Sequence, residues 1–152
     1  MKKLLCLTLA VVVVLSCKDE PIDIRDASVG RYTGTATFYV LRGSTLVQTE
    51  VIKADPISIS KKTSAPDELI IDFGDGDKAT GTGVKESSTG LTFNLENFVN
   101  STNFQFTGYP GYESDGNKYH GGFKNDGNQI ELWYQYTLHD TIKVTKCSMA
   151  RR

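Results

Sequence analysis

Few side chains in this sequence could act as nucleophiles, acid–base catalysts or metal ligands. The chain of 152 residues has two histidines, His120 and His139, and three cysteines, Cys6, Cys17 and Cys147. Neither histidine has a partner at a spacing typical of a metal site, and Cys147 is remote from both in sequence. No Gly-x-Ser-x-Gly, His-Glu-x-x-His or phosphate-binding loop is present. We therefore expect no catalytic residues, no metal and no cofactor.

The densest group of carboxylates lies in the segment Asp72–Asp77, which reads DFGDGD. Such a group could bind Ca²⁺ through its oxygens, but the spacing and the terminal Glu of an EF-hand are missing. Gly and Asp tolerate the positive φ angles of tight turns. The segment therefore predicts a hairpin turn.

The amino terminus has the pattern of a secretory signal peptide. Lys2 and Lys3 precede an apolar run of 12 residues, Leu4–Leu15. A permanent transmembrane helix needs roughly 20 apolar residues, so this run is too short to span a bilayer. A positive start followed by a short apolar run is typical of a signal that is removed. We assign residues 1–16 to it.

The residues at the end of this signal, Val14-Leu15-Ser16-Cys17, resemble the lipobox of bacterial lipoproteins. In that family a diacylglyceryl group is attached to the cysteine thiol, and cleavage leaves this cysteine as the new amino terminus. The resemblance implies that Cys17 is lipidated and holds the protein on a membrane, because two or three acyl chains anchor stably. Ordinary cleavage beside an unrelated cysteine is the alternative.

Three charged residues, Lys18, Asp19 and Glu20, follow the lipidation site directly. They resemble the export signal of surface lipoproteins in Bacteroidetes, which implies display on the outside of the outer membrane. A charged start to a tether facing the periplasm is the alternative. Residues 18–28 are charged, contain a proline and lack a sustained period, so residues 17–28 are expected to form the lipidated start and a flexible tether.

The rest of the chain, residues 29–152, has the size of a single domain. Removal of residues 1–16 leaves 15 Lys and Arg against 18 Asp and Glu, a net charge of −3. This balance lacks the basic patch of a nucleic-acid-binding protein. The aromatic content of 10% also argues against a disordered chain.

Apolar residues of this domain recur with a period of two. After Gly30 the even positions Tyr32 to Val40 are apolar or small, and the odd positions are mostly threonines. A partner strand is expected from Thr45 to Ala54, where Pro56 should interrupt the pairing. The longest alternation runs from Ile130 to Leu138. Similar short runs, including one through Phe104 and Phe106, bring the expected number of strands to eight to ten.

The expected fold is all-β and antiparallel. Strands joined by short turns favour an up-and-down meander, and such a meander must close or stack to protect its edges. We expect closure into a barrel, with a β-sandwich as the alternative.

The residues Gly30-Arg31-Tyr32 resemble the opening of lipocalin-like (calycin) barrels, in which a Gly-x-Trp begins the first strand. In that superfamily a basic residue of the last strand packs over the aromatic ring, and Lys146 is the nearest candidate here. With the lipobox, the chain resembles the small calycin-like lipoproteins of Bacteroidetes. The resemblance implies a barrel that binds small hydrophobic molecules.

Aromatic residues on the predicted strands are the candidates for a binding site, since their rings combine an apolar face with a polar tip. We expect a hydrophobic or glycan ligand to be lined or contacted by Tyr32, Phe38, Tyr119, Trp133, Tyr134 and Tyr136. Trp133 lies on the strand face opposite Leu132 and Tyr134, either exposed or in a second core. The alternative function is a solid barrel that binds or inhibits a partner protein.

Overall fold

The computed structural model describes residues 22–102 and 104–152. Apart from one short 3-10 helix, η1 (Ile24–Ser28), its regular structure is entirely β. No helix among these residues is long and apolar enough to cross a membrane. The signal peptide, Cys17 and Lys18–Glu20 lie outside the described residues.

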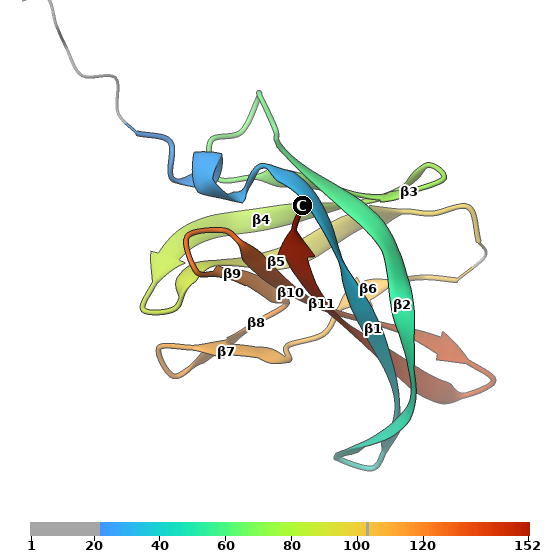
Figure 1. The fold of residues 1–152 in the computed structure, drawn as a ribbon. Helices are drawn as coiled ribbons and strands as arrows, with labels where there is room; N and C mark the ends of the chain where they lie inside the picture. Colours follow the sequence, from blue (N-terminus) through green and yellow to red (C-terminus); the bar gives the residue numbers. More distant parts are fainter. Residues whose placement is uncertain (1–21, 103) are drawn as a thin grey trace, which may run out of the picture.

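Eight antiparallel strands form a closed hydrogen-bonded ring (Figure 1). Each of these strands pairs with the next in the chain, and the last pairs back onto the first. The ring consists of β1 (Gly30–Arg42), β2 (Thr45–Lys61), β3 (Leu69–Gly74), β4 (Asp77–Ser87), β5 (Gly90–Val99), β9 (Gly121–Lys124), β10 (Gln129–Leu138) and β11 (Thr141–Arg151). The expected antiparallel meander is confirmed, and its eight ring strands lie within the expected number.

Three further strands occupy the connection between β5 and β9. The two-residue strand β6 (Thr107–Gly108) pairs with β10. The strands β7 (Tyr112–Ser114) and β8 (Asn117–Tyr119) pair with each other as a separate hairpin. The alternation of Phe104 and Phe106 predicts a strand, but these two residues precede β6 in irregular structure.

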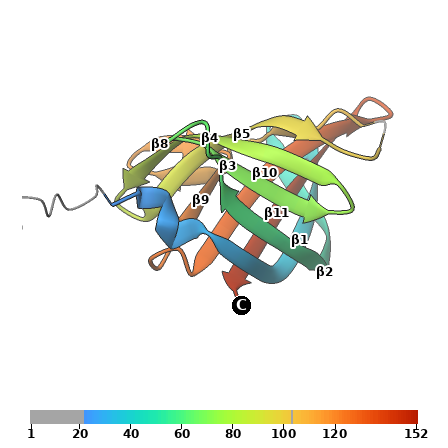
Figure 2. The same cartoon turned by 90° about the horizontal axis from the view of Figure 1, so that it is seen from above.

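The ring has two different ends, which Figure 2 places to the left and right. The first end, called here the N-terminal end, carries η1, the loop 62–68 and the turn 125–128. The opposite end, called here the distal end, carries the β3–β4 turn and the β10–β11 turn. The hairpin turn predicted within Asp72–Asp77 is present and joins β3 to β4.

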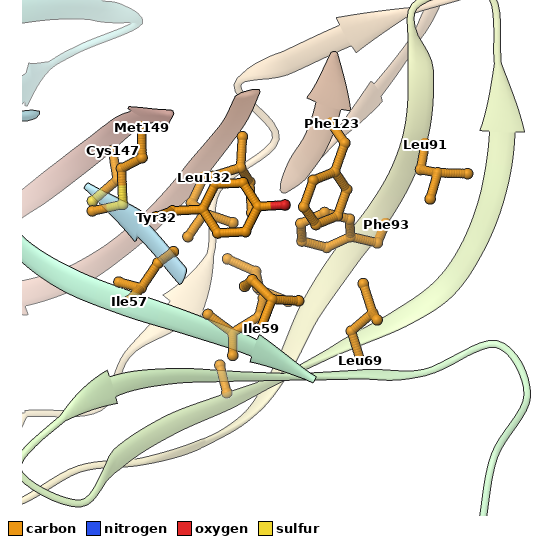
Figure 3. Packing of buried hydrophobic residues seen from close by; sticks show 14 of the residues in the cluster. Tyr32, Ile57, Ile59, Leu69, Leu91, Phe93, Phe123, Leu132, Cys147 and Met149 are labelled. Carbon is orange, nitrogen blue, oxygen red and sulfur yellow. The ribbon is translucent and has the colours of Figure 1, made fainter. Parts of the chain in front are cut away.

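The interior of the ring is filled over much of its length by the side chains that the period-two pattern predicts (Figure 3). Tyr32 lies at the centre of this core, with its ring centroid 6.0 Å from that of Phe123, and Phe123 lies 5.4 Å from Phe93. Burying each large apolar side chain contributes about 1.5–3 kcal/mol. This core holds the strands of the ring in register.

A network around Tyr32 closes the N-terminal end. Its hydroxyl lies 2.8 Å from the carbonyl of Ser28 and 2.7 Å from that of Gly127, and it accepts a hydrogen bond from Arg151 Nη2 at 3.1 Å. Gly127 has φ +78°, and a Cβ there would lie 1.8 Å from the carbonyl oxygen of Ala27. Only glycine therefore fits this turn against the η1 segment.

The basic residue over the Tyr32 ring is Arg151, whose guanidinium carbon lies 5.6 Å from the ring centroid. The expectation that Lys146 fills this place is wrong. Lys146 lies on the other face of β11, 5.1 Å from the ring centroid of Trp133 and 3.1 Å from the carboxylate of Glu131. Because odd and even positions of a strand face opposite ways, Arg151 reaches the interior side and Lys146 does not.

Outside the ring, the β7–β8 hairpin covers the outer face of β10 and β11. Tyr112, Tyr119 and Trp133 form a second buried cluster there with Val144. Trp133 is only 8% exposed, and its indole Nε1 donates to Glu131 at 2.7 Å. Of the two alternatives for Trp133, the second core is the one found.

Pro56 does not end its strand. β2 continues through it to Lys61, and the register with β1 shifts where Asp55 and Pro56 together stand opposite Thr33. A bulge removes these residues from the hydrogen-bond ladder, so the missing amide hydrogen of proline is tolerated.

The domain begins earlier than the sequence suggests, because η1 lies within the expected tether 17–28. Arg25, 7% exposed, makes two hydrogen bonds to the carboxylate of Asp23, at 2.9 and 2.7 Å. Its Nη1 donates to the carbonyls of Lys62, Ala65 and Glu68 at 3.2, 2.7 and 2.9 Å. The arginine hydrogen bonds keep the pKa of Asp23 well below its usual range. One side chain thus fixes the start of the chain to the loop 62–68.

We predict that Arg25→Ala lowers the free energy of unfolding by about 2–3 kcal/mol, because the charged hydrogen bonds to three carbonyls are lost. Urea unfolding of the full chain measures this. The matched control is Arg31→Ala, whose side chain is exposed on β1 and should change stability by less than about 0.5 kcal/mol. Equal losses in the two variants would contradict the proposed role of Arg25.

Candidate functional site

The six aromatic residues predicted to line a site fall into three places. Tyr32 is fully buried at the N-terminal end, and Tyr119 and Trp133 belong to the outer cluster. The other three lie toward the distal end, where Phe38 and Tyr134 face the interior of the ring and Tyr136 packs against phenylalanines 104 and 106. The distal half of the ring is therefore the candidate site.

Two hollows in this half of the molecule have Tyr134 in their lining. The first, of about 100 Å³, is lined by Phe73, Asp77, Lys78, Phe98, Val99, Asn100, Phe106 and Tyr134. The second, of about 200 Å³, is lined by Ala36, Phe38, Ile52, Lys53, Ala54, Asp55, Ile57, Phe73, Tyr134, Cys147 and Met149. Both contain Phe73 and Tyr134, whose ring centroids are 5.8 Å apart, so this aromatic pair forms a wall common to the two hollows.

The first hollow is built around Tyr134. The rings of Phe98 and Phe106 lie 6.2 and 5.9 Å from its ring centroid and 6.1 Å from each other. These separations are in the range in which aromatic pairs attract each other beyond simple burial. The result is an aromatic surface with one phenolic hydroxyl in the interior.

The polar groups at the edge of the first hollow already have partners. Asp77 accepts a hydrogen bond from the backbone amide of Ser101 at 2.7 Å, and Lys78 lies 3.3 Å from the carboxylate of Asp72. A third group, the side-chain amide of Asn100, donates to the carbonyl of Phe104 at 3.2 Å. The surface offered to a ligand is therefore mainly apolar.

The second hollow contains the thiol of Cys147 beside the hydroxyl of Tyr134, with the sulfur and oxygen 3.8 Å apart. Burial raises the pKa of the Cys147 thiol to about 11, and burial, followed by the neighbouring thiol, raises the pKa of Tyr134 well above its usual value. Both groups are neutral at physiological pH. A protonated, buried thiol is a poor nucleophile, so the pair forms a weakly polar patch in an apolar hollow.

Phe73, Phe98 and Phe106 were missed as site residues by the sequence reasoning. A signal exists for Phe73, because it continues the inward positions Leu69 and Ile71 of β3. The alternation through Phe106 predicts a strand instead, but Phe106 lies in irregular structure and reaches Tyr134 through the path of the β5–β6 connection, which a period of two does not predict.

The two histidines have structural positions. His120 Nδ1 accepts a hydrogen bond from the backbone amide of Leu95 at 3.0 Å, and burial lowers the pKa of His120. His139 is exposed in the β10–β11 turn with φ +46°. Among residues 22–102 and 104–152, no group of three or more His, Cys, Asp or Glu side chains is placed to hold a metal ion.

The carboxylate-rich segment forms the β3–β4 turn. Asp72 Oδ1 accepts a hydrogen bond from the amide of Gly74 at 2.9 Å, and this bond, together with Lys78, lowers the pKa of Asp72. Asp75 has φ +51°, the left-handed conformation that Asp tolerates in turns. These carboxylates thus shape the turn at the edge of the first hollow.

The chain has no significant match to a protein-family model, to a curated protein or to a solved structure. Its function must therefore be argued from its own residues and geometry.

We predict that the Cys147 thiol makes folding stability depend on pH in the alkaline range. Its pKa is raised from 9.0 to about 11 in the folded state, so the unfolded chain releases the proton first as the pH rises. Stability should be full below about pH 9 and fall by up to about 3 kcal/mol between pH 9 and 11. Urea unfolding at pH 7, 9 and 10.5 should show a steeper fall for the natural chain than for Cys147→Ala, whereas parallel curves would exclude the effect.

Proposed function

We propose that this protein is a lipid-anchored binding protein of the bacterial outer membrane that takes a small hydrophobic ligand at the distal end of its ring. The observation that carries the proposal is the pair of aromatic-lined hollows that share Phe73 and Tyr134. An apolar hollow with a few polar groups is the usual form of a small-molecule site.

The volumes limit the size of the ligand. A dry cavity of about 150 Å³ holds one benzene molecule, whereas sites for drug-sized ligands measure about 300–1,000 Å³. The first hollow, of about 100 Å³, is smaller than that cavity, whereas the second, of about 200 Å³, matches one ring, two fused rings or a short branched chain. A long-chain fatty acid is too large for either. Of the two ligand classes that an aromatic site could bind, the mainly apolar lining favours a hydrophobic ligand over a glycan.

The position of the chain start supports the anchor. Asp23 lies six positions after Cys17, and η1 and Arg25 attach it to the N-terminal end. A lipid on Cys17 would therefore hold that end within about 20 Å of the membrane surface. The hollows would then open toward the medium, where a ligand arrives, and display on the cell surface through Lys18, Asp19 and Glu20 suits this orientation.

The contact between Arg151 and Tyr32 supports a lipocalin-like origin for the ring. It pairs an aromatic residue at the start of β1 with a basic residue at the end of β11. This is the arrangement that the resemblance of Gly30-Arg31-Tyr32 to calycin barrels implies. We propose membership of that superfamily on this contact and on the ring of strands.

The anchor predicts a modified amino terminus. The native protein, extracted from membranes, should begin at Cys17 and carry two or three acyl chains on it. Intact-mass measurement of the amino-terminal peptide tests this, with the chain carrying Cys17→Ser as the control that stays unprocessed. A native peptide without lipid that begins at Lys18 or later would refute the anchor.

The second hollow predicts binding of a hydrophobic molecule of one or two rings, and indole serves as the probe. Met149 lines the second hollow and is the only methionine after Met1, so its ¹³C-labelled methyl group gives a specific NMR signal. In full chain reconstituted in phospholipid nanodiscs, indole should shift this signal with a dissociation constant near or below about 1 mM, which corresponds to about −4 kcal/mol.

Two matched variants on neighbouring positions of β1 test where indole binds. Ala36→Phe fills the second hollow and should weaken binding at least about tenfold, or by 1.4 kcal/mol. Thr35→Phe adds the same ring to the exposed outer face and should leave binding unchanged. Equal affinity in all three chains would refute the hollow as a ligand site.

A further inference from the structure

One long strand of the ring lacks a partner along most of its outer edge. β2 has 17 residues, but β3 pairs only with Ser58–Lys61 at its end. Within the described part of the chain, residues 45–57 of β2 therefore pair with β1 on one side and with no strand on the other. Figure 1 shows the β1–β2 hairpin extending beyond the rest of the ring, with β2 on its outer side.

This edge combines free backbone groups with exposed apolar side chains. Val51 is 51% exposed and Ile52 is 42% exposed, on opposite faces of the strand. Register shifts at Thr49 and at Asp55–Pro56 bound a regular stretch, Glu50–Ala54. Unpaired amides and carbonyls on an apolar strand are a template for a further strand.

The edge borders the second hollow. Ile52 and Ala54 stand opposite Ala36 and Gly34 of β1, so their side chains face the interior of the ring. Ile52, Ala54 and the edge residue Lys53 all line the hollow. The second hollow therefore lies on the inner side of β2, along the part of this strand that extends beyond its pairing with β3.

We propose that Glu50–Ala54 of β2 binds an extended peptide strand of a partner protein, which pairs with the free edge and places an apolar side chain in the second hollow. The added strand extends the wall of the ring where β3 is too short. Alternate side chains of the strand face inward, so the recognised segment has apolar residues at alternate positions. The proposal depends neither on the lipid anchor nor on a small ligand.

A second copy of this chain fits the edge less well. In an antiparallel pair related by a two-fold axis, opposed residues share a face, so the sum of their numbers is even. Glu50 and Lys53 therefore never stand opposite each other. A pair centred on Val51 brings Glu50 against Ile52, and one centred on Ile52 brings Val51 against Lys53. In both registers, the residues that flank the central pair therefore set a charged side chain opposite an apolar one.

The test uses a cyclic hairpin peptide that presents one edge of five residues, alternating Val and Thr, and carries N-methyl groups on its other edge to prevent stacking. It is added at up to about 1 mM to full chain in nanodiscs. Hydrogen exchange should slow at backbone amides within Glu50–Ala54 and stay unchanged in β4, and the Met149 methyl signal should shift. The matched control peptide is N-methylated on both edges and should bind at least tenfold more weakly.

Two variants of the protein locate the site. Ile52→Lys puts a charge at the inner side of the edge and should weaken peptide binding at least tenfold. Val29→Lys changes an exposed apolar residue between η1 and β1, at the opposite end of the ring from both hollows, and should have no effect. Because the two peptides are compared on the unmodified chain, the test stands even where Ile52→Lys destabilises the fold.

Three outcomes would overturn the proposal. The first is unchanged exchange throughout β2, and the second is equal binding of the two peptides. The third is a concentration-dependent dimer in sedimentation equilibrium that Ile52→Lys dissociates, which would assign the edge to a second copy. Loss of indole binding alone would refute the small-ligand function and leave the strand site intact.

Discussion

The unequal lengths of β2 and β3 determine which half of this ring is solid and which is open. The loop 62–68 joins the end of β2 to the start of β3, but β2 has 17 residues and β3 has six. Near that loop the two strands pair, and the interior between them is filled by Ile59, Leu69 and Ile71. Beyond Phe73 the wall has no strand next to β2, and both the second hollow and the free edge lie there. A longer β3 would both close the second hollow and pair with the free edge of β2.

The N-terminal end, in contrast, is closed by contacts between distant segments of the chain. Arg25 joins η1 to the loop 62–68, and Arg151 joins the last strand to Tyr32 and to the carbonyl of Ala27. These contacts connect segments far apart in sequence, so this end resists local opening while the distal end is left accessible. This difference between the two ends suits the proposed anchor beside the N-terminal end and the proposed binding surface at the distal end.

The period-two pattern was sufficient to predict the all-β fold and the inward residues of β1 and β10, because each strand has one buried face. It could not predict which contacts form across the ring. Lys146 and Arg151 are both basic residues of β11, and only the register with β1 places Arg151 over Tyr32. The same holds for Trp133, whose cover comes from the β7–β8 hairpin, and for Phe106, which lies in irregular structure. Arg25 was hidden because a 3-10 helix of five residues has too little periodicity to stand out in a charged segment.

An exposed edge normally carries a risk of aggregation, and β2 limits that risk in ways that also define what can bind. The bulges at Thr49 and Asp55–Pro56 interrupt the ladder, and Glu50 and Lys53 place charges within it. A five-residue partner segment gains about 0.5–1.5 kcal/mol for each hydrogen bond but loses about 1–2 kcal/mol for each residue that becomes ordered. The backbone contacts alone therefore bring little net affinity. The side chain that enters the hollow supplies the difference, and a segment that is already extended in its own protein is favoured over a flexible one.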